Sequence, residues 1–258
     1  MTWQTLSVVR DGPILRVWLD RPERRNALNG TALEEIAAVF GSLATDFATR
    51  VVVLGGRGAS FCAGADRKDP PGHHRLVASW EATERERRWT AQIGLRAARA
   101  VEDAEVPTIA RLHGHVIGGG LVLAAACDFR LAAEGTVFHV PEVDLGIPLT
   151  WGATPRLIHE IGAARARELI MLAAPFDAAE ALRIGLVHRV VPAPDLDALA
   201  DDFARRLAAK PEAAVHMTKT QFRGYARRAA LGDATESDGD LLVAASRGDT
   251  ARRSFPTK

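Results

Sequence analysis

The sequence predicts an α/β fold that continues into a helical C-terminal region. Up to about residue 155, short apolar runs typical of buried strands alternate with helical patterns, and after it nearly every segment has the pattern of a helix. No fixed-period repeat and no Ser/Gly-rich linker divides the 258 residues. A chain of this length holds one large or two small domains, at about 150 residues each. We therefore expect one functional domain, with a core over 1–193 and a helical region over 194–258.

The first elements are predicted from alternation and from all-apolar runs. Alternating apolar and polar residues over 14–19 predict a strand in a hairpin that turns at 11–13. Residues 31–48 have the apolar spacing of an amphipathic helix. Val51–Leu54 is entirely apolar, as expected of a strand that is buried on both faces, and loop composition follows at 55–58.

The middle of the chain continues the alternation. The patterns predict a loop over 67–75, a helix over 76–103, a strand over 108–112 and a strand over 137–140 that Pro141 ends. Three glycines, Gly118–Gly120, precede a helix over 121–126. Further helices are predicted over 155–173, 178–184, 195–209, 211–230 and 235–248.

Composition excludes several classes of protein. Lys and Arg number 33 and Asp and Glu 32, so the net charge of +1 indicates neither a nucleic-acid nor a membrane-surface partner. Two cysteines, Cys62 and Cys127, are too few for a disulfide framework or a four-cysteine zinc site, which favours a reducing compartment. No apolar run approaches the roughly 20 residues of a spanning helix, and no secretory signal is visible. We expect a cytoplasmic protein without a metal site.

Three segments have the residue patterns of a catalytic site. Small residues over Ser60–Asp66 follow a buried strand, and a tight turn there can leave a backbone N–H pointing into a cleft. Gly118–Gly120 at a helix start let a ligand approach the backbone, where the first N–H groups lack partners. Together the two loops could donate to one developing oxyanion. Glu142 follows a strand and a proline, and a carboxyl facing an apolar pocket can move protons.

In this order and spacing, the segments resemble the crotonase superfamily, the enoyl-CoA hydratase/isomerase family. The resemblance extends over nearly the whole chain, through 21–28, 61–66, 107–128, 141–157 and 178–191. It implies a crotonase-like spiral of ββα units with an α-helical C-terminal trimerisation region. It also implies an enzyme whose substrate is an acyl-CoA thioester, with no separate cofactor because coenzyme A is part of the substrate. A homotrimer or a hexamer, as a dimer of trimers, is the implied assembly.

The resemblance also assigns roles to residues. The backbone N–H groups of Ala65 and Gly119 would form the oxyanion hole, and Glu142 would be the acid/base. For Arg24 and Arg25, a solvated turn is the alternative to contact with CoA phosphates, and for Lys258 it is a frayed tail. Asp66 fits a turn better than proton transfer. The substrate-binding candidates are Arg24, Arg25, Ala27, Ala63, Asp66, Gly118, Thr150 and Lys258.

One departure from the family pattern bears on the reaction. Familiar enoyl-CoA hydratases carry two glutamates, of which one matches Glu142 and the other would fall at Val122. Moving a double bond needs a single base, so an enoyl-CoA isomerase is favoured. A hydratase of altered pattern, with help from Asp144, Thr150 or His139, is the alternative, and a non-catalytic acyl-CoA-binding relative is the second. A dienoyl-CoA isomerase is disfavoured, because its further acids would fall at 122 and 150.

Overall fold

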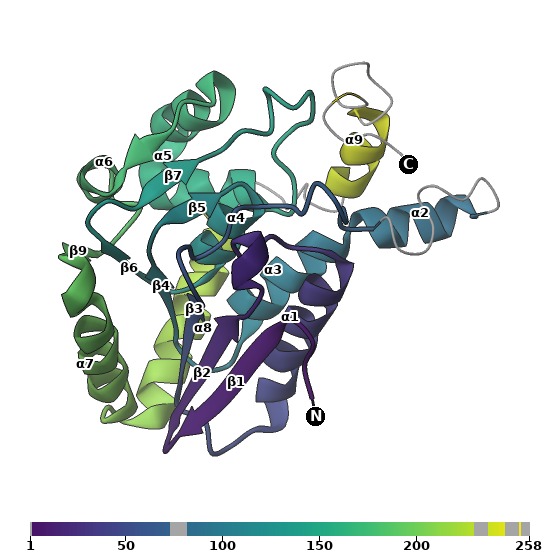
Figure 1. Ribbon diagram of the computed structural model, residues 1–258. Helices are drawn as coiled ribbons and strands as arrows, with labels where there is room; N and C mark the ends of the chain where they lie inside the picture. Colours follow the sequence, from purple (N-terminus) through teal and green to yellow (C-terminus); the bar gives the residue numbers. More distant parts are fainter. Residues whose placement is uncertain (1, 73–81, 230–236, 246–252, 254–258) are drawn as a thin grey trace.

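A six-stranded sheet forms the centre of the molecule, with strand order β1-β2-β3-β4-β6-β9 (Figure 1). The computed structural model describes residues 2–72, 82–229, 237–245 and 253. β1 and β2 are antiparallel and form the predicted hairpin, whereas every other neighbouring pair is parallel. The strands are β1 (Leu6–Asp11), β2 (Ile14–Leu19), β3 (Val51–Gly56), β4 (Thr108–Leu112), β6 (Phe129–Ala133) and β9 (Arg189–Val191).

A second sheet of three strands lies beside the first. It contains β5 (His115–Ile117), β7 (Val137–His139) and β8 (Phe176–Asp177), with β5 parallel to β7 and β7 antiparallel to β8. The chain adds a strand to each sheet in turn before a helix follows: β4 and β5 precede α4 (Gly119–Ala126), and β6 and β7 precede α5 (Ala153–Leu172). This repetition is the predicted spiral of ββα units, and the α/β fold class is confirmed.

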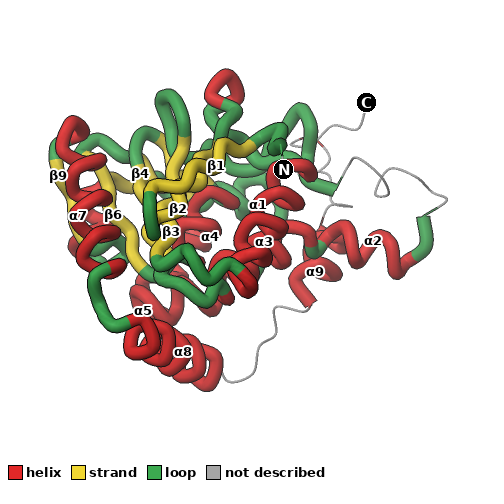
Figure 2. Tube along the Cα trace, turned by 90° about the horizontal axis from the view of Figure 1, so that it is seen from below, coloured by secondary structure: helices red, strands yellow, loops and turns green. Residues whose placement is uncertain are grey.

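Helices cover both faces of the large sheet. The larger apolar cluster lies on the side of α1 (Gly30–Ser42), α3 (Ile93–Asp103) and α4, and the smaller one lies under α7 (Leu196–Ala208) (Figure 2). Alternate β3 residues enter the two clusters, Val52 and Leu54 one and Val51 and Val53 the other. This explains why Val51–Leu54 is apolar at every position. The remaining α-helices of the described residues are α2 (Glu84–Ala91), α6 (Ala178–Arg183), α8 (Glu212–Ala229) and α9 (Asp238–Ala245).

Several predicted boundaries are wrong. The helix predicted over 76–103 is two helices where the structure describes it, because Gln92 leaves the helical conformation between α2 and α3. Helix α1 ends at Ser42 and not at 48. Helix α5 is interrupted at Gly162, whose φ is 77°. The short strands β5, β6, β8 and β9 were not predicted as strands.

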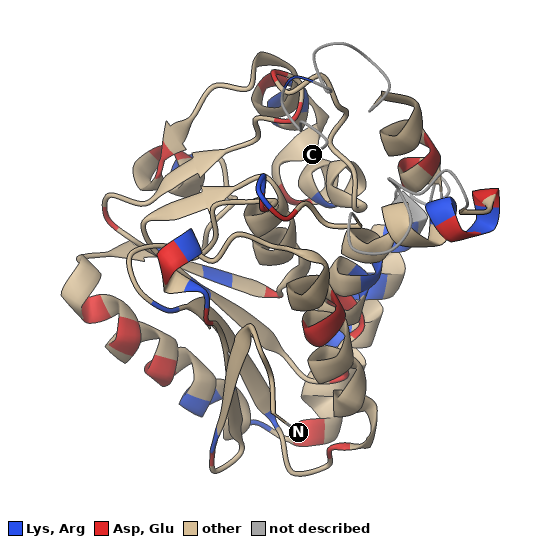
Figure 3. Cartoon of the chain, turned by 45° about the vertical axis from the view of Figure 1, so that its right-hand side comes forward, with Lys and Arg blue, Asp and Glu red and all other residues tan. Residues whose placement is uncertain are grey.

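Charge is evenly mixed over the surface. Basic and acidic side chains alternate along α2, whereas α7 has its acidic residues first and Arg205 and Arg206 near its end (Figure 3). Within the described parts of the chain, no helix is both long enough and apolar enough to cross a membrane. The mixture agrees with the near-zero net charge of the sequence.

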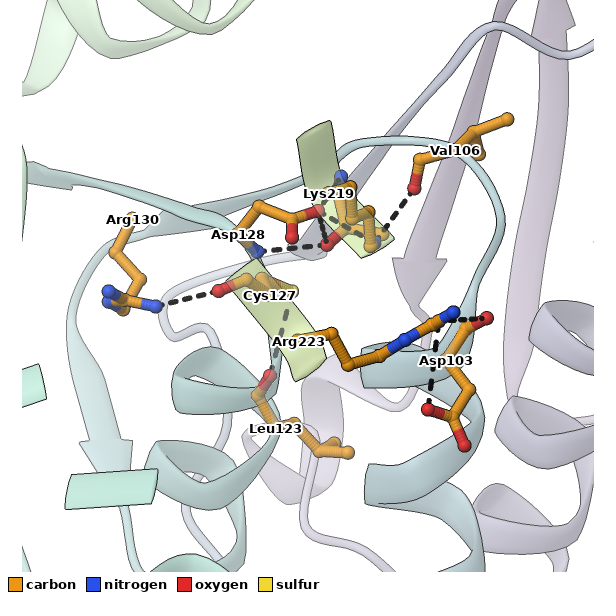
Figure 4. Close-up of polar contacts among 9 residues, drawn as sticks. Asp103, Val106, Leu123, Cys127, Asp128, Arg130, Lys219 and Arg223 are labelled. Carbon is orange, nitrogen blue, oxygen red and sulfur yellow. Dashed lines mark hydrogen bonds and ion pairs between the residues drawn. The ribbon is translucent and has the colours of Figure 1, made fainter. Parts of the chain in front are cut away.

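An ion pair with a buried lysine and a half-buried aspartate attaches α8 to the sheet. Lys219 donates from Nζ to the carbonyl of Val106 (2.9 Å) and to Oδ2 of Asp128 (2.7 Å) (Figure 4). The same Asp128 oxygen accepts the N–H and the hydroxyl of Thr108. Only 7% of the Lys219 side chain is exposed, so its charge is compensated by these partners and not by water.

Replacing Lys219 by methionine should lower the free energy of unfolding by about 3 kcal/mol, the low end of what breaking a buried pair costs. Asp128 would lose its cationic partner but keep both Thr108 donors, which limits the loss. Urea denaturation measures the change, with the exposed Lys210 replaced by methionine as the matched control. Equal midpoints for the two variants would contradict a stabilising role of this pair.

Candidate active site

The loop that follows β3 is held on both sides by backbone hydrogen bonds. Leu28 donates to the carbonyl of Gly64 (2.8 Å) and accepts from Asp66 (2.8 Å), which attaches the loop to the segment before α1. On the other side, the backbone N–H of Cys62 donates to the carbonyl of His115, and the carbonyl of Cys62 accepts the N–H of Ile117, both in β5. The Ala65 N–H points away from both partners and has no hydrogen bond within the described residues. It is therefore free to bind a ligand.

Three glycines form the neighbouring turn and the start of α4. The N–H of Gly118 donates to the carbonyl of His139 (2.9 Å). The N–H of Gly119 has no partner among the described residues, as expected for a first helical residue. Gly118 has φ of 47°, and a β-carbon on it would lie 2.6 Å from Oε1 of Glu142. A β-carbon on Gly120 would lie 2.7 Å from that of Cys62. The turn therefore needs glycine.

The two loops lie against each other. A β-carbon on Gly64 would lie 3.0 Å from the carbonyl oxygen of Ile117, the residue that precedes the glycine turn. The unpaired N–H groups of Ala65 and Gly119 thus belong to touching segments, as an oxyanion hole requires.

Glu142 brings a carboxyl group to this turn. It follows Pro141 after β7, and its carbonyl accepts from Leu145 and Ile147 in a tight loop. Its Oε1 packs on Gly118, and its Oε2 is buried without a hydrogen-bond partner among the residues that the structure describes. Burial raises the pKa of Glu142 to about 7, against the opposing effect of its own backbone N–H. A carboxyl with this pKa can both accept and donate a proton at neutral pH.

The raised pKa makes stability depend on pH. Between the ordinary value of 4.5 and about 7, the folded protein holds a proton on Glu142 that the unfolded chain has lost, so stability falls as pH rises. Glutamine does not titrate, so the stability of Glu142→Gln relative to wild type should increase with pH. We expect this difference in the free energy of unfolding to grow by on the order of 2–3 kcal/mol from about pH 5 to about pH 8. Thermal melting at the two pH values measures it. A difference that shrinks as pH rises would contradict the buried carboxyl.

Helix α4, which begins directly after the glycine that Glu142 packs on, is apolar at every position. Val122, where a second glutamate was considered, is buried in the larger core cluster. Asp144 is exposed, and the ring of His139 is hydrogen-bonded to the carbonyl of Ala173 (2.7 Å). Thr150 is buried at the turn before α5.

Four of the predicted substrate-binding residues lie on or beside the loop that carries Ala65. Arg24 and Arg25 are exposed at the end of the short 3₁₀ helix Pro22–Arg24, and the carbonyl of Arg25 accepts the N–H of Ala63 (3.0 Å). This places both arginines beside the loop that carries Ala65. Ala27 and Ala63 are half-buried there. Lys258 lies outside the described residues.

Asp66 has a structural role in the same loop. Its Oδ2 pairs with Arg21 (2.9 Å), and its Oδ1 accepts the N–H groups of Lys68 and Asp69. Burial alone would raise the pKa of Asp66, but these partners together hold it below its usual range. Because both oxygens are engaged, Asp66 acts in the turn, which was the preferred interpretation of this residue.

Sequence reasoning missed two residues that build the site. The buried side chain of Asn26 donates to the carbonyls of Arg57 and Ser60 (both 2.8 Å), and Arg21 donates to the carbonyl of Ala27 (2.6 Å). Both hold the loops together and lie in the 21–28 motif, which was used only as a family marker. Cys62 is no nucleophile, because burial raises the pKa of its thiol to about 12.

No metal site accompanies these loops. Over the ranges that the structure describes, no three His, Cys, Asp or Glu side chains are grouped so as to hold a metal ion.

Comparison with known proteins places these features in one family. The family model described as enoyl-CoA hydratase/isomerase matches residues 10–255. A short-chain-enoyl-CoA hydratase of Clostridium acetobutylicum is 36% identical over 211 residues, which is 81% of this chain and 77% of that protein. A mitochondrial Δ(3,5)-Δ(2,4)-dienoyl-CoA isomerase of Pongo abelii is 36% identical over 217 residues, 80% of this chain and 64% of that protein.

Solved structures include both reaction types as well. The crystal structure of an enoyl-CoA hydratase from Mycobacterium avium subsp. paratuberculosis matches with a TM-score of 0.86 at 25% identity, covering 98% of this chain and 95% of that one. A monofunctional enoyl-CoA isomerase from M. smegmatis matches with a TM-score of 0.68 at 28% identity, covering 86% of this chain and 93% of that one.

Proposed function

The chain belongs to the enoyl-CoA hydratase/isomerase family, and from this premise we propose that it is an enoyl-CoA isomerase that uses Glu142 as its one proton carrier. The observation that carries the proposal is the one buried carboxyl, with a pKa of about 7, that the described part of the chain places on the glycine turn at Gly118. Val122 puts an apolar side chain where a second acid would help to hold water. Relatives of both reaction types exist, so the distinction depends on these residues.

The reaction follows from the positions of the groups. The thioester oxygen of a 3-enoyl-CoA binds the N–H groups of Ala65 and Gly119, and the Glu142 carboxylate removes a proton from C2. The electron pair of that C–H bond moves onto the thioester, which becomes a dienolate whose negative oxygen the two N–H groups stabilise. Glu142 then returns its proton to C4, the double bond comes to lie between C2 and C3, and the formula is unchanged.

A hydratase of altered pattern is the second candidate, favoured by the identity of 36% with a short-chain-enoyl-CoA hydratase. Incubation with 2-enoyl-CoA and with 3-enoyl-CoA, followed by chromatographic separation and mass spectrometry of the products, separates the candidates. Isomerisation gives a second thioester of unchanged mass that elutes at a different position, whereas hydration adds the mass of one water to 2-enoyl-CoA. Stoichiometric binding of both thioesters without any product would overturn both enzymes and leave an acyl-CoA-binding relative.

The proposal includes coenzyme A phosphates at Arg24 and Arg25, because both guanidinium groups are exposed beside the Ala65 loop. Replacing both by alanine should raise KM for an enoyl-CoA by about tenfold or more, since charge-assisted hydrogen bonds contribute about 1.5–3 kcal/mol each. The matching pantetheine thioester lacks the nucleotide phosphates and is the control. Steady-state kinetics with both substrates make the comparison, and an equal rise in KM for the two would refute the phosphate contact.

We also propose a homotrimer or a hexamer, supported by apolar side chains that are exposed on two neighbouring helices. Light scattering after gel filtration measures the assembly, and a monomer would reject it. The exposed side chains are Ile158, Met171 and Leu172 on α5 and Met217, Phe222 and Tyr225 on α8.

We further propose that the protein lies in the cytoplasm, the compartment in which the two buried thiols, Cys62 and Cys127, stay reduced.

A further inference from the structure

The indole of Trp151 lies between two helices beside the proposed oxyanion hole. A β-carbon on Gly94 of α3 would lie 2.0 Å from its ring, and one on Gly119 of α4 would lie 2.3 Å from it. The ring therefore packs directly on two glycine backbones, and either position would reject any other residue without a shift of the indole. Gly94 stands inside a helix, where glycine is unfavourable, and this close approach explains its presence.

The backbone of Trp151 is held in an uncommon conformation. Its φ is 59°, in the left-handed region that bulky residues avoid, so neighbouring contacts must maintain it. Two side chains do this: Arg156 donates to the Trp151 carbonyl (2.9 Å), and Asp238 accepts the N–H of Gly152 (2.6 Å). Arg156 is itself paired with Glu102 of α3 (2.6 Å). The turn at 151–152 is thus fixed from both sides.

Asp238 reaches this turn from the far end of the chain because α9 packs against α2 (Figure 1). Gly239 makes the close approach, since a β-carbon there would lie 2.9 Å from Gln92. Asp240 adds an exposed ion pair with Arg88 (2.8 Å). Helix α9 therefore places one carboxylate on the turn that carries the indole.

We propose that Asp238 is a positioning residue that holds the Trp151 indole beside Gly119, so that the indole limits the length of the acyl chain the site accepts. The inference rests on the proposed function in one respect, the binding of the thioester oxygen to the Gly119 N–H. An oxygen bound there lies about 2.9 Å from that nitrogen, so the acyl group begins beside the ring that covers the same residue. Short acyl groups fit this geometry, whereas long ones compete with the indole for space.

Binding of saturated acyl-CoAs tests this inference without any turnover. Calorimetry gives the affinity for chains of about four to twelve carbons, whose preference rests on apolar burial. We expect wild type to favour the short chains and Trp151→Ala to shift the preference toward long chains by about tenfold or more. Asp238→Ala should shift it several-fold in the same direction, and Asp238→Asn, which keeps an oxygen acceptor, should restore most of the wild-type profile.

The double variant Asp238→Ala/Trp151→Ala isolates the mechanism. If Asp238 acts through the indole, the double variant has the chain-length profile of Trp151→Ala alone, so the two effects are not additive. Asp240→Ala is the matched control on α9, because an exposed ion pair contributes little and the residue does not touch the turn. Circular dichroism confirms that each variant is folded.

Different results would overturn different statements. An unchanged profile in Trp151→Ala, additive shifts in the double variant, or an equal shift in Asp240→Ala would overturn the role of Asp238. The expected profile in wild type and the expected shifts in the variants, with no turnover of any enoyl-CoA, would overturn the proposed reaction and support the positioning role. Wild type that binds no acyl-CoA would overturn both.

Discussion

Replacing Glu142 by glutamine should lower kcat by about a thousandfold while the affinity for a saturated acyl-CoA stays within a few-fold of wild type. Glutamine keeps the size of the side chain on Gly118 but can neither take the C2 proton nor return it. Because no second carboxyl is proposed to act with Glu142, no other side chain would take over the transfer. Glu142→Ala should lose at least as much activity.

The pH profile gives this prediction a second readout. Burial raises the pKa of Glu142 to about 7, and proton removal needs the carboxylate, so kcat/KM should fall as pH drops below about 7. Any residual activity of Glu142→Gln should lack this dependence. Glu134→Gln makes the same chemical change at an exposed position and is the control. Wild-type turnover in Glu142→Gln would remove Glu142 from the mechanism.

The parts of the site that the sequence predicted are those that depend on local chemistry. A buried strand leads into small residues at 60–66, three glycines start α4, and Glu142 follows a proline. Each pattern is complete within about seven residues, so it can be read without knowing the neighbours in space. The structure adds the contact between the two loops at Gly64 and Ile117.

The parts that escaped prediction depend on distant partners. Strands β5, β8 and β9 have two or three residues each and become strands through pairing with segments far along the chain. The contact between Asp238 and Gly152 joins residues 86 positions apart. Trp151 adopts a positive φ that its residue type disfavours, and the glycines of two other helices, Gly94 and Gly119, make room for its ring.

The same packing decides how the oxyanion hole can be tested. Gly119→Pro removes the N–H, but its ring atoms would also collide with Trp151, so lost activity alone would have two causes. Two variants, Gly119→Ala and Gly119→Pro, are therefore each combined with Trp151→Ala, which provides room for a β-carbon at 119. The alanine double variant keeps the N–H, and the proline double variant lacks it. Proline is tolerated at a first helical position, which is where Gly119 stands in α4.

We expect the proline double variant to have a kcat about 100- to 1000-fold below that of the alanine double variant, the usual cost of losing one oxyanion donor. Affinity for a saturated acyl-CoA should differ far less between the two, because charge on the thioester oxygen develops only during the reaction. Steady-state kinetics and calorimetry on the folded pair measure both quantities. Equal kcat values with equal affinities would show that the Gly119 N–H does not act on the thioester oxygen, and equal kcat values with a lost affinity would show that it binds the ground state and the transition state equally well.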